Sequence, residues 1–199
     1  MAARRFGVRQ NDKLRPIDNF SEFHVNQAFG AEERVGMWGI DEVVSWSRAW
    51  MKAVSDEGRV CITDVDGQQW KGQIHHSWKV SDWRKVCGRV ADLKSAYKQL
   101  PIHPAHAFLS IIAVRDPSSQ QTKFFRAYAL MFGETAAVYA FLRISRALSM
   151  LGKVLFDLVL VEFFDDFTQL ECEELTQSAQ DAMEGCAPNI KGEVHFRND

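Results

Sequence analysis

Long hydrophobic runs, clustered cysteines and an excess of charge of one sign are all missing from this sequence of 199 residues. Its richest apolar stretch, VLFDLVLVEFF, is interrupted by Asp157 and Glu162, so no segment reaches the ~18 to 20 apolar residues of a membrane span. The four cysteines have no CxxC spacing, which argues against a zinc ribbon and a disulfide framework. The beginning of the chain is charged and has no apolar signal-peptide core. We therefore expect a soluble, intracellular protein with no membrane partner, and the sequence does not distinguish nucleus from cytoplasm.

Charge is nearly balanced overall but unevenly distributed. The chain has 24 Lys plus Arg against 26 Asp plus Glu, which excludes nucleic-acid binding through bulk positive charge. Residues 1–16 are basic, with Asp12 as their one acid, whereas residues 154–190 contain acidic residues and no Lys or Arg. Either the two segments attract each other, or one holds a polyanion and the other holds cations. The sequence leaves both alternatives open.

Apolar residues are abundant and follow regular patterns. With 46% hydrophobic residues, 14 Phe and six Trp, the chain has ample surface for a folded core. Their spacing indicates an α+β fold with one acidic hairpin near position 165. The pattern predicts helices over 41–54, 93–100, 135–151 and 177–184, and strands over 5–8, 14–17, 89–92, 108–114 and 123–130.

Two neighbouring aspartates, Asp165 and Asp166, stand between the apolar runs of the predicted hairpin. Two unit charges ~4 Å apart repel by about 4 kcal/mol at an effective dielectric of 20, so a cation is expected there; the alternative is a solvated turn. Asp92 ends a predicted strand and either joins them or caps the helix expected over 93–100. Three carboxylates suit two Mg²⁺ or Mn²⁺ ions, and such pairs promote phosphoryl transfer.

Four motifs follow one another in this chain: KLRPIDNFS, DLKSAYKQLPIHP, ALMFGETAAVYAFLRISRAL and FFDDF. Their order resembles the fingers and palm of reverse transcriptases, specifically those of DIRS-like retroelements that also encode a tyrosine recombinase. The resemblance implies a polymerase right-hand palm, an antiparallel sheet with helices on one face, plus partial fingers and no thumb. It divides the chain into fingers-like residues 1–88 with a Trp-rich insert, palm-like residues 89–185 with the three aspartates, and a divergent tail, 186–199.

The resemblance also implies residue roles in a metal centre. It makes Asp92, Asp165 and Asp166 catalytic ligands of two Mg²⁺ or Mn²⁺ ions, and adds the backbone carbonyl of Leu93 as a metal ligand. Tyr97 corresponds to the aromatic gate under the incoming sugar, which favours deoxynucleotides. The tail offers Lys191 in place of the family's general-acid lysine only by coincidence.

Further residues are implied to bind the nucleotide and the template. Arg15, assisted by Lys13, corresponds to the clamp on the triphosphate; the alternative for Arg15 is a surface pair with Asp18. Phe132 and Gly133 would line the template and the nucleotide base, since glycine lets a flat ligand approach the backbone. The six tryptophans either stack on bases or, as we prefer, fill a small core.

The expected activity is that of an RNA-directed DNA polymerase, which adds deoxynucleotides to a primer 3′ end on an RNA or DNA template. Its partners would be primed template and deoxynucleoside triphosphates, and RNase H and recombinase modules would belong to the same element. One alternative is an inactive retroelement remnant that binds nucleic acid without turnover. Another is an interaction module unrelated to polymerases.

Overall fold

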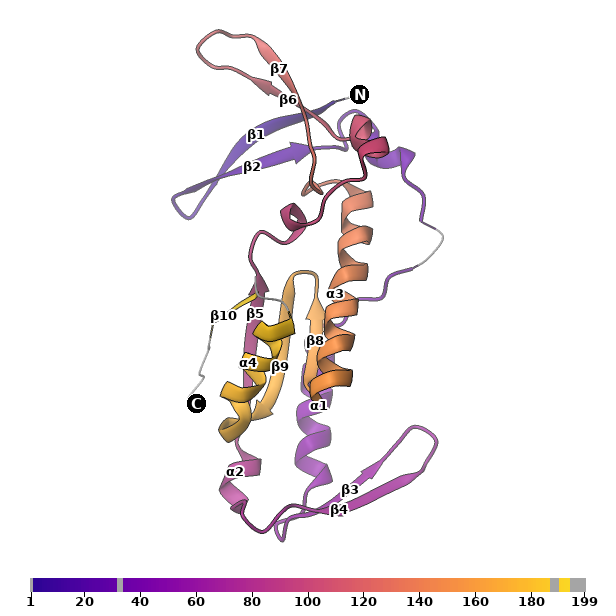
Figure 1. The fold of residues 1–199 in the computed structure, drawn as a ribbon, viewed down its shortest axis with the longest axis vertical. Helices are drawn as coiled ribbons and strands as arrows, with labels where there is room; N and C mark the ends of the chain where they lie inside the picture. Colours follow the sequence, from indigo (N-terminus) through magenta and orange to yellow (C-terminus); the bar gives the residue numbers. More distant parts are fainter. Residues whose placement is uncertain (1, 32–33, 187–189, 194–199) are drawn as a thin grey trace. The chain divides into compact units, whose positions relative to one another are not determined.

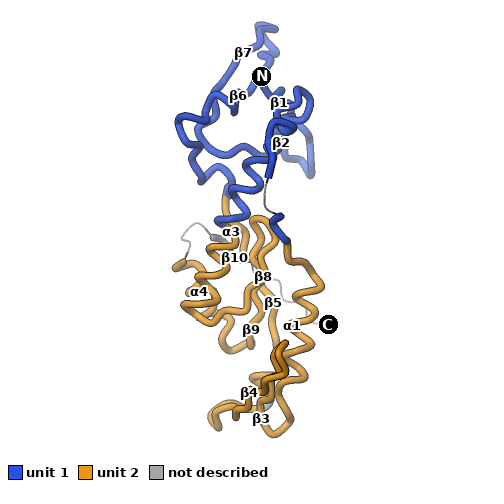
Figure 2. Tube along the Cα trace, turned by 90° about the vertical axis from the view of Figure 1, so that its right-hand side faces the viewer, with its two compact units in different colours: residues 1–36, 95–144 blue, residues 37–94, 145–199 orange. Residues whose placement is uncertain are grey.

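The computed structural model describes residues 2–31, 34–186 and 190–193, and it is an α+β protein, as expected. It has two compact units, residues 1–36 with 95–144 and residues 37–94 with 145–199 (Figure 2). This division differs from the predicted boundaries at residues 88 and 185, because strand pairing joins distant parts of the chain within each unit. Within the part of the chain that the structure describes, no helix is both long and apolar enough to cross a bilayer.

Unit 1 contains a four-stranded sheet in the order β2-β1-β6-β7. The predicted hairpin at the start of the chain is confirmed as β1, Ala3–Gln10, and β2, Lys13–Asn19, which pair antiparallel. The second hairpin consists of β6, Ile111–Arg115, and β7, Thr122–Arg126, and β6 pairs parallel to β1. Both strands are shorter than expected because the 3-10 helix η3 occupies Pro104–Leu109 and the chain leaves β7 after Arg126.

A small apolar core holds unit 1 together. Phe20 and Met131 are buried in it beside Ile112 of β6. The short 3-10 helices η1, Val25–Ala28, and η2, Ala96–Gln99, lie outside the sheet. The helical piece predicted over 93–100 is confirmed only as the short η2: Leu93 still belongs to a strand, and Ser95 has a left-handed φ of 62° that delays the start of the helix.

Unit 2 is built on an antiparallel sheet in the order β10-β5-β9-β8. The predicted acidic hairpin is confirmed as β8, Val159–Phe163, and β9, Asp166–Cys172. The strand expected over 89–92 is the longer β5, Val86–Leu93. In the predicted tail, Ile190–Glu193 forms β10, while residues 187–189 and 194–199 lie outside the described residues.

Helices lie on both faces of the unit 2 sheet, whereas the resemblance implied one face. Residues 145–156 of α3, Thr135–Phe156, and helix α4, Thr176–Cys186, share one face (Figure 1). On that face Gly152 lies close to the side chains of Leu160 and Met183. Helix α1, Ile40–Ala53, packs on the other face. This helix is amphipathic, and its apolar side faces the sheet: Trp46 and Trp50 line a small cavity together with strand residues of that face.

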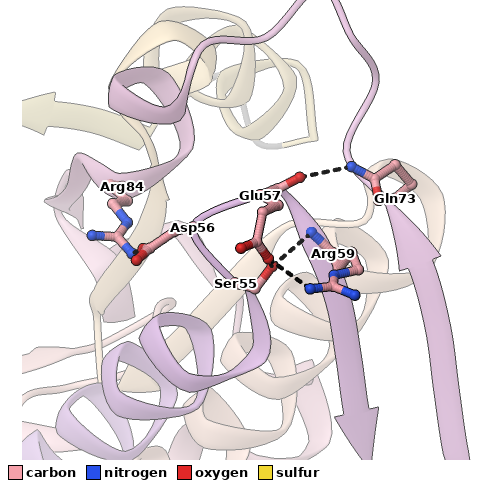
Figure 3. Close-up of polar contacts among 6 residues, drawn as sticks. All are labelled: Ser55, Asp56, Glu57, Arg59, Gln73 and Arg84. Carbon is pink, nitrogen blue, oxygen red and sulfur yellow. Dashed lines mark hydrogen bonds and ion pairs between the residues drawn. The ribbon is translucent and has the colours of Figure 1, made fainter.

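The region between α1 and β5 forms a hairpin and a short helix, where the sequence showed no regular pattern. Its elements are β3, Arg59–Thr63, β4, Gln69–Gln73, and α2, Val80–Arg84. At the base of the hairpin, Arg59 pairs with Glu57 at 2.8 Å. Figure 3 shows the polar contacts there among Ser55, Asp56, Glu57, Arg59, Gln73 and Arg84.

The predicted tryptophan core exists for half of the tryptophans. Trp83 is buried with Cys172, and Trp50 and Trp78 pack against them. The indole Nε1 of Trp50 donates a hydrogen bond to the Trp83 carbonyl at 2.8 Å. The other three side chains are exposed, namely those of Trp38, Trp46 and Trp70.

Candidate functional site

The three aspartates come together at one end of the unit 2 sheet. Asp92, next to last in β5, lies directly opposite Asp166, the first residue of β9. Asp165 precedes Asp166 in the hairpin turn, and its carbonyl accepts a hydrogen bond from the Leu93 N–H at 3.1 Å. Asp92 is thus a strand residue and no helix cap, since Ser95 holds the cap position of η2.

Strand alternation places Asp92 and Asp166 on the face that does not carry α3 and α4. Directly opposed residues of an antiparallel pair project to the same side, and the side changes at every residue. Phe167, next to Asp166, therefore points toward the helices and is fully buried, while Asp166 is exposed. Exposed Val90 and Phe163 share the face of the aspartates. This end of the face is open to a ligand.

The carboxylates act on one another as like charges. Burial raises the pKa of Asp166 above its ordinary value, and the neighbouring Asp165 and Asp92 raise it further. Among the residues that the structure describes, no three His, Cys, Asp or Glu side chains already form a metal cage. The donor set nevertheless fits Mg²⁺ or Mn²⁺, because carboxylate oxygens are their preferred ligands and a cation would relieve this repulsion. Leu93, the other implied ligand, is held beside the turn by its own N–H.

Ser145 of α3 binds the hairpin turn from the face of the sheet that carries α3 and α4. The hydroxyl of Ser145 donates to the carbonyl oxygen of Phe164 at 2.7 Å. One and two turns further along α3, Ser149 and Lys153 bind the buried Glu162 of β8. Sequence reasoning missed these residues, because a serine in a helix gives no signal of a partner in a hairpin.

Tyr97, the implied sugar gate, is largely an interior residue of unit 1. Its ring stacks on Phe141 with centroids 4.6 Å apart and meets Phe132 edge-on at 5.8 Å. Only 6% of Tyr97 is exposed, compared with 65% of Phe132. A ligand in unit 1 would therefore meet Phe132 over a much larger area than Tyr97.

Gly133 is required by a contact inside unit 1. Its φ is 98°, and a Cβ atom there would lie 2.6 Å from the carbonyl oxygen of Asp18. The side chain of Asn26 fixes the same loop, because its Nδ2 donates to the Gly133 carbonyl at 3.0 Å and its Oδ1 accepts from the Thr135 N–H. No sequence pattern connects Asn26 with residues so far along the chain, so sequence reasoning missed it.

Arg15 and Lys13 are exposed on β2, in unit 1. The alternative role for Arg15, a pair with Asp18, is not what the structure shows. Arg5 binds the buried Asp18 through two hydrogen bonds of 2.7 and 2.9 Å, and this contact raises the pKa of Arg5. The four implied nucleotide and template residues of unit 1 thus belong to a different compact unit from the aspartates.

Comparison with known proteins yields no match of either kind tested. No protein-family model matches the chain, and no curated protein matches it. The function is therefore argued from the residues and their geometry.

Proposed function

We propose that this chain is a reverse transcriptase-like fingers and palm unit, which adds deoxynucleotides to a primer 3′ end by two-metal phosphoryl transfer. The observation that carries the proposal is the opposition of Asp92 and Asp166 beside Asp165, at the open end of an antiparallel sheet. Like charges placed face to face cost stability, and perturbed carboxylates of this kind are typical of functional sites. The order of the four motifs supports the same function.

In this proposal the three aspartates hold two Mg²⁺ or Mn²⁺ ions and the backbone of Leu93 supports them. When bound, the ions would stabilise the attacking and leaving oxygens of an in-line displacement. Arg15, with Lys13, binds the triphosphate because a guanidinium stays charged and matches phosphate geometry.

The aromatic residues of unit 1 serve the nucleotide and the template in the same proposal. Phe132 offers an exposed ring for a base, and Gly133 shapes the backbone beside it. Tyr97 favours a deoxyribose over a ribose through its small exposed part, and its ring contacts that of Phe132 edge-on.

Strand β7 of unit 1 offers exposed aromatic and basic side chains suited to a nucleic-acid strand. Phe124 and Phe125 are 68% and 51% exposed, and alternation pairs Phe124 with exposed Arg126 on one face of the strand and Phe125 with exposed Lys123 on the other. Aromatic rings stack on bases and basic side chains follow the phosphates, without sequence preference. These residues equally favour the second candidate, an inactive retroelement remnant that binds nucleic acid without turnover.

A primer-extension assay separates the two candidates. The unmutated chain, given a primed RNA or DNA template, Mg²⁺ or Mn²⁺ and a labelled deoxynucleotide, should extend the primer. The double variant Asp165→Asn/Asp166→Asn should lose extension and still bind primed template in fluorescence anisotropy. Asp181→Asn, in an exposed position of α4, is the matched control and should extend normally. Binding without any extension by the unmutated chain would favour the remnant.

A further inference from the structure

We propose that Ser145 is a positioning residue that sets the divalent-metal affinity of the aspartate centre by holding the turn of the β8–β9 hairpin. Ser149 and Glu162 anchor the same hairpin, and the four residues Ser145, Ser149, Lys153 and Glu162 are called the α3 clamp below. The inference rests on the proposed function, since it needs the aspartates to bind a metal.

The clamp follows one stripe of α3. Residues four apart lie on the same side of a helix, so Ser145, Ser149 and Lys153 face the sheet together. Ser149 donates to Glu162 Oε2 at 2.6 Å, and Lys153 lies 3.4 Å from the same oxygen. Arg146 adds charge at 4.0 Å from Glu162 Oε1. The helix therefore binds the buried Glu162 of β8 through the Ser149 hydroxyl and the Lys153 ammonium group, and it binds the turn through the Ser145 hydroxyl.

The two serines are unusual as packing residues at this position. Ser145 is 1% exposed and Ser149 is 0% exposed, although a helix packed on a sheet gains more from apolar side chains. A buried hydroxyl is costly unless it is hydrogen-bonded. Both serines meet that need by bonding to the hairpin, so each hydroxyl joins α3 to a defined hairpin atom.

The Phe164 carbonyl, which accepts the hydrogen bond from Ser145, lies directly before the two aspartates in the chain. Phe164 has a left-handed φ of 54°, which is unfavourable for an aromatic residue. Its carbonyl belongs to the peptide group that begins Asp165, so fixing that oxygen fixes the peptide plane from which Asp165 and Asp166 follow. Without this bond the turn gains alternative conformations, and the carboxylates lose part of their shared orientation.

Glu162 anchors the hairpin and is no additional metal ligand. It lies opposite Phe167 in the β8–β9 ladder, whereas Phe163 lies opposite Asp166. Alternation therefore puts Glu162 on the face that carries α3 and α4, and Asp166 on the opposite face. The α3 clamp therefore contacts the hairpin on the side of α3, whereas the Asp166 carboxylate projects from the opposite side.

The test is a titration with Mn²⁺ alone, followed by the melting temperature of the full chain. A metal that binds only the folded form raises the melting temperature with concentration. Ser145→Ala should need about fivefold more Mn²⁺ for the same rise, which corresponds to the loss of one hydrogen bond. Ser145→Thr retains the hydroxyl and should restore most of the affinity. Ser47→Ala is the matched control, because that hydroxyl donates to the Val43 carbonyl within its own helix.

Hydrogen exchange on the metal-free protein gives a second readout. The amides of Asp165 and Asp166 should exchange faster in Ser145→Ala than in the unmutated chain or in Ser47→Ala. If Ser145→Ala does not fold, Ser145→Cys, of similar size and with a weak donor, should show the same weakening.

Failure of this inference is distinguishable from failure of the proposed function. If Mn²⁺ stabilises the unmutated chain, Asp165→Asn/Asp166→Asn abolishes the effect, and Ser145→Ala keeps the original midpoint, the positioning role is overturned. A lower melting temperature with an unchanged Mn²⁺ midpoint would likewise reduce Ser145 to packing. If Mn²⁺ has no effect on the unmutated chain, the metal centre itself is overturned, and the inference with it.

Discussion

Asp92 and Asp166 are direct cross-strand partners in the β5–β9 ladder, and both project from the face opposite α3 and α4. Opposite charges are common at such positions because they stabilise a sheet, whereas like charges oppose pairing. Asp165 adds a third carboxylate beside them. The sheet therefore brings three carboxylates together at one end, where Lys191 of β10 is the partner of Asp92 on its other side.

Removing one of these charges should stabilise the metal-free protein. Asp166→Asn is expected to raise the free energy of unfolding at pH 7 by about 0.5 kcal/mol, as for other like-charge pairs across strands. Because the folded-state pKa of Asp166 is raised, its ionisation destabilises the folded protein as pH rises from the ordinary value of 3.8 through the folded-state pKa. Below 3.8 this destabilisation is absent. Thermal melts in EDTA at pH 7 and below pH 4 test this. An equal gain at both pH values would contradict it, and Asp181→Asn should show no gain.

Gly133 should tolerate no side chain. Gly133→Ala combines a left-handed φ with a Cβ atom 2.6 Å from a backbone oxygen, so we expect a loss of about 2 to 3 kcal/mol. Gly67→Ala is the matched control, since its φ is 82° but nothing lies within 4 Å of the added Cβ. It should cost only about 1 kcal/mol. Denaturant unfolding, combined with hydrogen exchange in unit 1 for Gly133→Ala and in unit 2 for Gly67→Ala, measures the two losses. Equal losses would refute the proposed clash.

The Arg5–Asp18 pair should matter much more than the pair that the neighbouring Arg4 of β1 makes with Glu22. Asp18 has a side-chain exposure of 5%, so Arg5→Gln leaves a buried charge without its partner and should cost about 3 kcal/mol. Arg4 and Glu22 are 61% and 30% exposed, and Arg4→Gln should cost less than about 1 kcal/mol. Chemical denaturation of the two variants side by side is the measurement. Similar losses would show that burial of Asp18 is unimportant.

Glu171 should destabilise the protein once it ionises. Burial raises the pKa of its carboxyl, although one carboxylate oxygen accepts a hydrogen bond from the Cys172 N–H at 2.8 Å. A raised pKa in an acid means that stability is lost as pH rises through the folded-state value, starting from its ordinary value of 4.5. Glu171→Gln should therefore melt at a slightly higher temperature than the unmutated chain at pH 8, with a smaller difference at pH 5. A difference that grows toward low pH would reverse the assignment.

Local pattern was enough to predict the elements that carry the aspartates. Two apolar runs identified β8 and β9, and the Asp165–Asp166 doublet marked the bend between them. The long helix was expected over 135–151 and continues to Phe156. Such signals depend on neighbouring residues, so they survive in a single sequence.

Contacts between distant residues could not be predicted in the same way. Arg5 and Arg15 are equally basic in the sequence, and only the strand pairing shows that Asp18 belongs to Arg5. The helical piece expected over 93–100 shrinks to η2 because pairing with β10 keeps Leu93 in β5. Tertiary pairing overrode local propensity there.

The alternation of β9 ties folding to chemistry. A shift of one position along this strand would turn Asp166 inward beneath α3 and bring Phe167, now fully buried, out into solvent. The hydrophobic energy that keeps Phe167 inside is therefore also what keeps the carboxylate outside. A chain with the shifted register would lose the burial of Phe167, and it would also lose the Asp166 carboxylate from the proposed ion-binding edge.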